Sequence, residues 1–134
     1  MGRTVLIADE DVHARIMAET LLRLRGLRVR FAGDGAEASA LVCHADVAVV
    51  VLDVDHAEMN GFELLRRLRG RFEALPLPTR PRVLAVTARR DPAVKRFALH
   101  LGADAVLYKP FAPARFIETA ERLVRGAAPQ TLCG

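Results

Sequence analysis

The chain has 134 residues, a formal net charge of +4 and 51% hydrophobic residues, which is the size of one domain with enough apolar material for a core. This composition excludes a disordered chain, and no apolar run approaches the roughly 18 residues that span a bilayer. Two cysteines make no disulfide framework, and the scattered histidines predict no zinc site. Because the N-terminus lacks the features of a secretory signal, we expect a cytoplasmic protein without a membrane segment.

Most of the positive charge comes from arginine. Of the 20 basic residues 18 are arginine, and a nucleic-acid partner could exploit their clusters. Acidic residues are interspersed with them, however, and the chain has one tyrosine and no tryptophan. A solvated surface explains this pattern as well, so nucleic-acid binding is not the expected function.

Apolar runs of strand length alternate with amphipathic stretches of helix length along the whole chain. In chain order, the pattern predicts a strand at Thr4–Ala8, a helix at Val12–Leu24, a strand at Arg28–Ala32, a helix at Gly35–His44, a strand at Val47–Leu52, a helix at Gly61–Arg71, a strand at Arg82–Thr87, a helix at Asp91–Leu101, a strand at Ala105–Tyr108 and a helix at Pro113–Arg125. These five strand–helix units predict a doubly wound parallel α/β sheet. Residues 1–126 would form the domain and 127–134 a short C-terminal tail.

Several elements carry more specific predictions. The polar alternation of Arg28–Ala32 is typical of a sheet edge, whereas Val47–Leu52 is apolar throughout and should be covered on both faces. In the first helix we expect the apolar side chains to face the core, namely Val12, Ile16, Leu21 and Leu24.

Charged and hydroxyl side chains follow the ends of four predicted strands. Asp9 and Glu10 follow the first strand, Asp53 the third and Lys109 the fifth, while Thr87 ends the fourth. Each has an ordinary explanation alone: the acids could favour a helix N-terminus or a turn, Thr87 could cap a helix, and Lys109 could be exposed. Together they converge on the edge where open α/β sheets bind ligands.

Electrostatics gives this convergence a chemical meaning. Two carboxylates about 4 Å apart repel by about 4 kcal/mol at an effective dielectric constant of 20. Lys109 supplies only one positive charge, and Mg²⁺ suits the site because it takes one or two carboxylates, keeps several waters and accepts phosphate oxygen. With these charges neutralised, Asp53 could attack a phosphoryl group while Thr87 hydrogen-bonds one of its oxygens. The residues therefore predict aspartyl-phosphate chemistry.

Four motifs carry a family resemblance: VLIADED, VVVLDVDHAEMNGFELLRRLR, VLAVTA and GADAVLYKPF. From Thr4 to Arg125 the chain resembles the receiver domain of bacterial two-component response regulators, and among them the single-domain chemotaxis regulators. The resemblance implies a flavodoxin-like, five-stranded parallel sheet in the order 2-1-3-4-5 with five helices. It also implies a protein that is not an enzyme beyond catalysing its own phosphorylation and dephosphorylation.

The resemblance assigns roles to individual residues. Asp53 would accept phosphate from a sensor histidine kinase or a phosphotransfer protein. Magnesium would be bound by Asp9, Glu10, Asp53 and the backbone carbonyl of Asp55. Thr87 would contact the phosphoryl group, Lys109 would pair with it, and the bond to Pro110 would be cis. An unidentified downstream protein would bind the face of the fourth helix, fifth strand and last helix. The domain could also form a homodimer.

The chain departs from the family pattern at several positions. Ala57 replaces a proline, and the loop before the fourth strand is about four residues longer than is common in the family. The aromatic switch position is Val106, and we expect Tyr108 to be out of phase with it, so the usual route from Thr87 to an aromatic ring is not expected. Family position also places Asp55 and Arg89 at the mouth of the pocket, where they could pair.

Two other functions remain as alternatives. A receiver-like module could bind partners without phosphorylation, although all the chemical positions are present. Asp53-Val54-Asp55 also resembles the nucleophile motif of haloacid-dehalogenase-type phosphatases, but those need a second acidic motif after the lysine, and only 25 residues follow Lys109.

Overall fold

The computed structural model describes residues 4–42, 46–55, 60–77 and 80–126. The elements follow in the order β1 (Thr4–Ala8), α1 (Val12–Leu24), β2 (Arg28–Phe31), α2 (Gly35–Leu41), β3 (Val47–Asp53), α3 (Gly61–Phe72), β4 (Arg82–Thr87), α4 (Pro92–Leu101), β5 (Ala105–Tyr108) and α5 (Pro113–Val124). All ten predicted elements are present and differ from the prediction by a few residues at their ends. The tail at 127–134, Ala57 and both cysteines lie outside the described residues.

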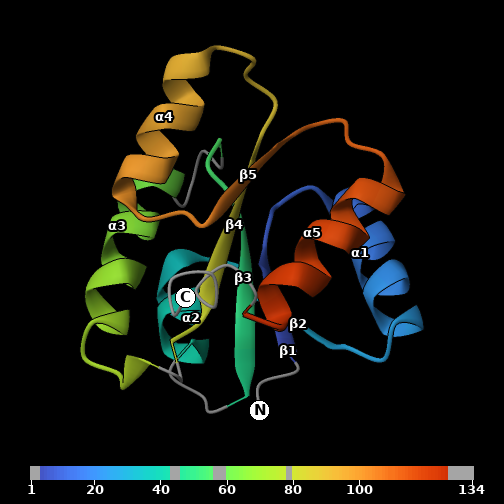
Figure 1. The fold of residues 1–134 in the computed structure, drawn as a ribbon, viewed down its shortest axis with the longest axis horizontal. Coiled ribbons are helices and arrows are strands. Elements are labelled where there is room, and N and C mark those ends of the chain that lie inside the picture. The colour runs from blue at the N-terminus through green and yellow to red at the C-terminus, as the bar shows by residue number, and fades with distance from the viewer. Residues whose placement is uncertain (1–3, 43–45, 56–59, 78–79, 127–134) are drawn as a thin grey trace, which may run out of the picture.

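All strand pairs are parallel, and the sheet has the order β2-β1-β3-β4-β5. The predicted fold class is therefore confirmed, with β2 at an edge and β3 in the centre. Helices α1 and α5 cover one face of the sheet, and α2, α3 and α4 cover the other (Figure 1). Among the described residues, no helix has the length and apolar character needed to cross a membrane.

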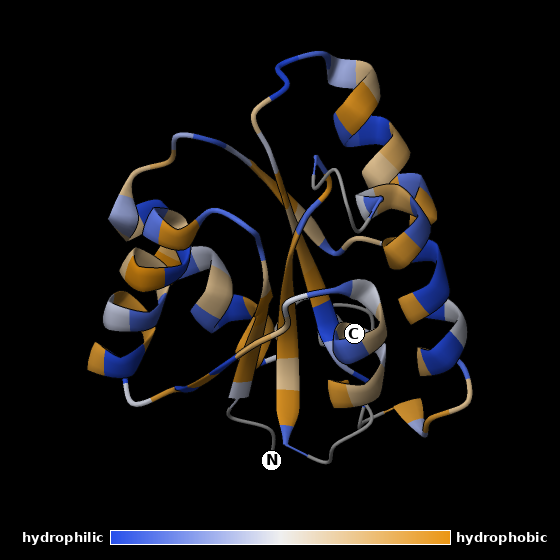
Figure 2. Cartoon of the chain, turned by 180° about the vertical axis from the view of Figure 1, so that it is seen from behind, coloured by the Kyte–Doolittle hydropathy of each residue, from blue (hydrophilic) through white to orange (hydrophobic). Residues whose placement is uncertain are grey.

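The core has two layers, one on each side of the sheet, because successive strand residues point to opposite faces. Val50 and Leu52 of β3 pack with α2, α3 and α4, whereas Val49 and Val51 pack with α1 and α5. Figure 2 shows the result: the central strands are mostly hydrophobic, while the helices alternate between hydrophobic and hydrophilic residues.

The prediction for the buried side of α1 holds for Leu21, which is partly buried against the core, but it is wrong for the other three residues. Val12, Ile16 and Leu24 are 56%, 57% and 77% exposed, and the buried residues of the helix are Ala18 and Leu22. At 3.6 residues per turn, Ile16 and Leu24 lie roughly 120° and 160° around the axis from Leu22, so they cannot share its contact with the sheet.

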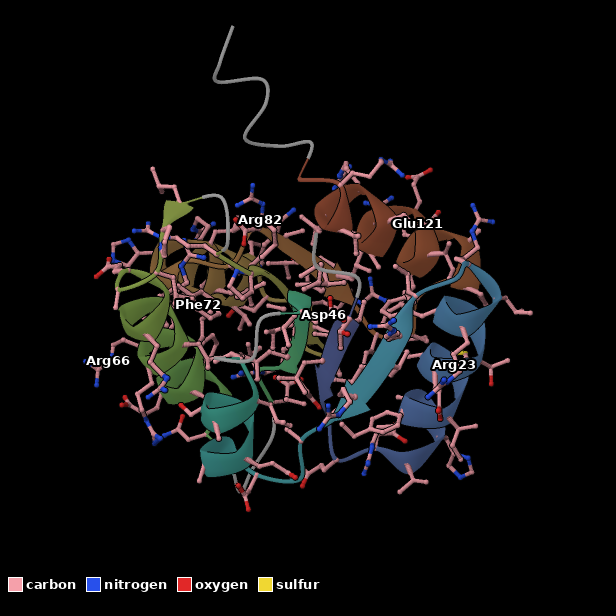
Figure 3. All side chains as sticks on the ribbon, turned by 90° about the horizontal axis from the view of Figure 1, so that it is seen from below. Arg23, Asp46, Arg66, Phe72, Arg82 and Glu121 are labelled. Atoms are coloured by element: carbon pink, nitrogen blue, oxygen red, sulfur yellow. The ribbon has the colours of Figure 1, made fainter. Side chains whose placement is uncertain are left out.

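Polar contacts stabilise the amino end of the sheet and the outer surface. Asp46, labelled in Figure 3, accepts a hydrogen bond from the Thr4 hydroxyl at 2.8 Å and pairs with Arg28 at 3.0 Å. Arg23 and Arg66 lie at opposite margins in the same view, and each pairs with a glutamate of its own helix at 2.8 Å. These arginines are thus exposed and partnered by nearby acids.

Candidate functional site

The parallel arrangement brings the predicted chemical residues to one edge of the sheet. Asp9 follows β1, Asp53 ends β3, Thr87 ends β4 and Lys109 follows β5. The carboxyl ends of these strands point toward the top of Figure 1. The peptide bond between Lys109 and Pro110 is cis, as the family resemblance implies.

Lys109 connects the two buried carboxylates. Its Nζ lies 2.8 Å from Oδ2 of Asp9 and 3.3 Å from Oδ2 of Asp53. The other oxygen of each carboxylate accepts a hydrogen bond from the backbone amide two positions later in the chain. Asp11 donates to Asp9 at 2.9 Å, and Asp55 donates to Asp53 at 2.8 Å. Each acid is therefore oriented by its own loop, and its second oxygen faces the ammonium group.

Burial shapes the charges of this cluster. Desolvation raises the pKa of Asp53 above its ordinary value, and the Asp9 charge acts in the same direction, although the Asp55 amide and Lys109 oppose them. Burial by itself would lower the pKa of Lys109, but its contacts with Asp9 and Asp53 outweigh burial and raise it. Two carboxylates thus share one ammonium, and an added cation would relieve the remaining negative charge.

The donor set fits a magnesium ion. Mg²⁺ commonly uses only one or two carboxylates and completes its shell with water and phosphate oxygen. Asp9 and Asp53, which are 4% and 8% exposed, provide two such carboxylates side by side. Glu10 is exposed, and no three His, Cys, Asp or Glu side chains within the described ranges are grouped as a metal cluster. Magnesium binding by this set, with Glu10 and the Asp55 carbonyl, stays a prediction.

A second cluster lies beside the first at the end of β4. Arg89 Nε is 2.8 Å from Oδ1 of Asp55, so the pair that was placed at the pocket mouth does form. The same carboxylate also accepts hydrogen bonds from the hydroxyl of Thr87, at 2.9 and 3.0 Å from its two oxygens, and from the amide of Ala88 at 2.7 Å. Burial would raise the pKa of Asp55, but the hydrogen bonds from Ala88, Thr87 and Arg89 outweigh it and lower that pKa.

Sequence reasoning missed the contact between Asp55 and Thr87. The strand register contains the signal, because Asp53 pairs with Val86 and the next residues of both strands are then neighbours. That register was not available from one sequence.

The prediction that Tyr108 is out of phase with Val106 is wrong once both residues lie on one strand, β5. Alternate residues of a strand share a face, so Tyr108 lies on the face of Val106, which packs against the core under α3 and α4. Tyr108 is the register partner of Thr87, and the Arg90 guanidinium lies 5.2 Å from the centre of its ring. Val106 itself is half-buried, and the absence of an aromatic switch at this position stays a prediction.

The family model for the response regulator receiver domain matches residues 5–121. The transcriptional regulatory protein GltR of Pseudomonas aeruginosa is 32% identical over 126 residues, which cover 94% of this chain and 50% of that protein. The response regulator MprA of Mycobacterium tuberculosis is 32% identical over 130 residues, covering 97% of this chain and 54% of the relative. The chain thus spans about half the length of the curated relatives it matches.

Solved structures agree with this result. The receiver domain of the Francisella response regulator 1452 is 26% identical with a TM-score of 0.80, covering 94% of this chain and 99% of that one. A CheY-like receiver domain protein from Methanospirillum hungatei has a TM-score of 0.81 at 22% identity, covering 97% and 99%, and shows the same fold. The chain therefore belongs to the family of response regulator receiver domains.

Proposed function

We propose that Asp53 takes a phosphoryl group from a sensor histidine kinase or a phosphotransfer protein, with Mg²⁺ bound, and that this switches the interaction of the domain with a downstream protein. The observation that carries the proposal is the Lys109 ammonium between the carboxylates of Asp9 and Asp53, at 2.8 and 3.3 Å. A structural ion pair would need one acid, whereas this arrangement keeps a second buried carboxylate available for chemistry.

The transfer step assigns a role to each residue. An oxygen of Asp53 forms a bond to phosphorus while the bond from phosphorus to the donor imidazole nitrogen breaks, and that nitrogen keeps the electron pair. Lys109 would then pair with an oxygen of the phosphoryl group, and the Thr87 hydroxyl would donate to another. Bound Mg²⁺, held by Asp9, Glu10, Asp53 and the Asp55 carbonyl, supplies positive charge for those oxygens.

The remaining parts of the proposal concern the setting of the domain. Receiver domains are signalling proteins and generally not enzymes, so the only catalysis proposed is of its own phosphorylation and dephosphorylation. We place the domain at residues 1–126, with 127–134 as a tail, in the cytoplasm. The face of α4, β5 and α5 is the proposed site for the downstream protein, and Leu99 of α4 is 42% exposed. A homodimer is the other proposed assembly.

Phosphorylation of purified protein by acetyl phosphate tests the proposal. Intact-protein mass spectrometry should show the addition of one phosphoryl group only when a divalent metal is present. Asp53→Asn should abolish the addition, because an amide is a poor nucleophile for phosphorus. Asp91→Asn is the matched control: it removes the same charge near the same edge, and asparagine caps a helix as well as aspartate does.

Labelling that persists in Asp53→Asn would contradict the assignment of the acceptor. If magnesium fails to shift any resonance of the Asp53 loop and no labelling occurs, a phosphorylation-independent module is the better description. Release of phosphate from small phosphoesters would instead favour a phosphatase.

A further inference from the structure

The hydroxyl of Thr87 is fully engaged inside the domain. Its proton is donated to the carboxylate of Asp55, with distances of 2.9 and 3.0 Å to the two oxygens, and its oxygen accepts the amide of Arg89 at 3.0 Å. A hydroxyl has one proton to donate. Thr87 can therefore hydrogen-bond to a phosphoryl group only after its bond to Asp55 is broken.

The Asp55 carboxylate lies in a cradle of donors at the end of β4. It accepts the Thr87 hydroxyl, the Ala88 amide at 2.7 Å and Arg89 Nε at 2.8 Å. These groups approach both carboxylate oxygens, as they would approach the oxygens of a phosphate. The cradle thus already holds an anion that belongs to the chain itself.

This cradle is next to Asp53. The Asp55 amide donates to Oδ1 of Asp53 at 2.8 Å, and the Val54 amide donates to the Val86 carbonyl at 3.0 Å. The loop after β3 is thereby held against the end of β4, one residue before Thr87. A phosphoryl group on Asp53 would find the hydroxyl of Thr87 and the amide of Ala88 as its nearest donors at the end of β4, and both already donate to Asp55.

We propose that the Asp55 side chain is an internal competitor of the phosphoryl group: it occupies the Thr87 and Ala88 donors in the resting domain and must leave them when Asp53 is modified. This inference rests on the proposed function of Asp53. Arg89 makes the exchange feasible, because its side chain is 52% exposed and can keep the carboxylate paired as the carboxylate moves away. Asp55 is then a positioning residue that holds Thr87 in its resting orientation and weakens phosphoryl binding.

Beryllofluoride with magnesium, as a probe of the phosphoryl group, tests this competition by calorimetric titration. In the wild type, two donors must be released from the Asp55 carboxylate before they can bind the probe. Removing that carboxylate leaves both donors free from the start. Asp55→Ala should therefore bind beryllofluoride about tenfold more tightly than the wild type, or about 1.4 kcal/mol at 25 °C. Asp55→Asn, which keeps the shape but weakens acceptance, should lie between the two. Asp91→Asn controls for the lost charge. Its beryllofluoride affinity should stay within about twofold of the wild type, because this change removes a charge but leaves the Thr87 and Ala88 donors bonded to Asp55.

The Ala88 amide gives a second readout that simple charge removal would not move. Its resonance should differ between wild type and Asp55→Ala without ligand and should coincide when beryllofluoride is bound, since Asp55 has then left. A difference that persists undiminished in the bound state would overturn the inference, as would unchanged or weaker binding by Asp55→Ala. If instead the wild type binds no beryllofluoride, or Asp53→Asn binds it equally well, the result contradicts the proposed function of Asp53 itself.

Discussion

The position of Lys109 leads to a quantitative prediction for stability. Replacing it by methionine keeps most of the aliphatic chain but removes the ammonium that lies between Asp9 and Asp53. Two buried carboxylates, 4% and 11% exposed in their side chains, would then face each other without a cation. We expect Lys109→Met to destabilise the metal-free domain.

The distances allow an estimate of the size of this effect. At an effective dielectric constant of about 20, separations of 2.8 and 3.3 Å correspond to roughly 6 and 5 kcal/mol of attraction. Most of this attraction is offset by the cost of removing the charged groups from water, and losing one partner of a buried pair costs about 3–5 kcal/mol. Because 20% of the Lys109 side chain remains exposed to screening water, we expect a loss of about 2–3 kcal/mol.

Thermal unfolding in buffer with a chelator measures this loss. For a domain of this size 1 kcal/mol changes Tm by roughly 3–5 °C, so Lys109→Met should unfold about 10 °C below the wild type. The pKa of Lys109 is raised in the fold, so its contribution is complete below the unfolded value of 10.5 and is lost as the pH rises through the folded value. A measurement at neutral pH therefore captures the whole effect.

Lys95→Met is the matched control, because Lys95 is the other lysine of the chain and lies exposed on α4. Its Tm should change by no more than about 2 °C, as is usual for surface substitutions. Adding Asp53→Asn to Lys109→Met should recover much of the lost stability, because one of the two facing charges disappears. A Tm of Lys109→Met within about 2 °C of the wild type would refute the argument.

Two further predictions concern the modified state. Arg89→Ala should speed the loss of phosphate from pre-phosphorylated protein by up to about fivefold, because an exposed ion pair is worth about 0–1 kcal/mol. Its magnesium affinity should stay nearly unchanged. Phosphate release that is unchanged or slower would show that Arg89 does not shield the site from water. Beryllofluoride should shift the resonances of the loops at Asp53 and Thr87 more than those of Val106 and Tyr108, because valine has no ring to reorient. Equally large shifts in β5 together with a new Tyr108 rotamer would contradict that prediction.

Much of this molecule follows from local sequence pattern. The alternation of apolar strand-length runs with amphipathic helix-length stretches predicted every element, because the period of side-chain direction differs between strands and helices. The edge position of β2 and the buried centre at β3 followed from their polarity. The convergence of Asp9, Asp53, Thr87 and Lys109 was also predictable, since parallel strands bring their carboxyl ends to one edge.

What a side chain touches was decided only by the tertiary structure. The side of α1 that meets the sheet depends on how the helix is rotated against β1, and the helix has apolar residues on more sides than it buries. The partners of Asp55 lie 32 to 34 residues away, at the end of β4 and just after it, so they depend on the register of β3 against β4. The neighbour of Tyr108 depends likewise on the register of β4 against β5, which pairs it with Thr87. Helix rotation and strand register result from packing between distant segments, which a local pattern in one sequence does not encode.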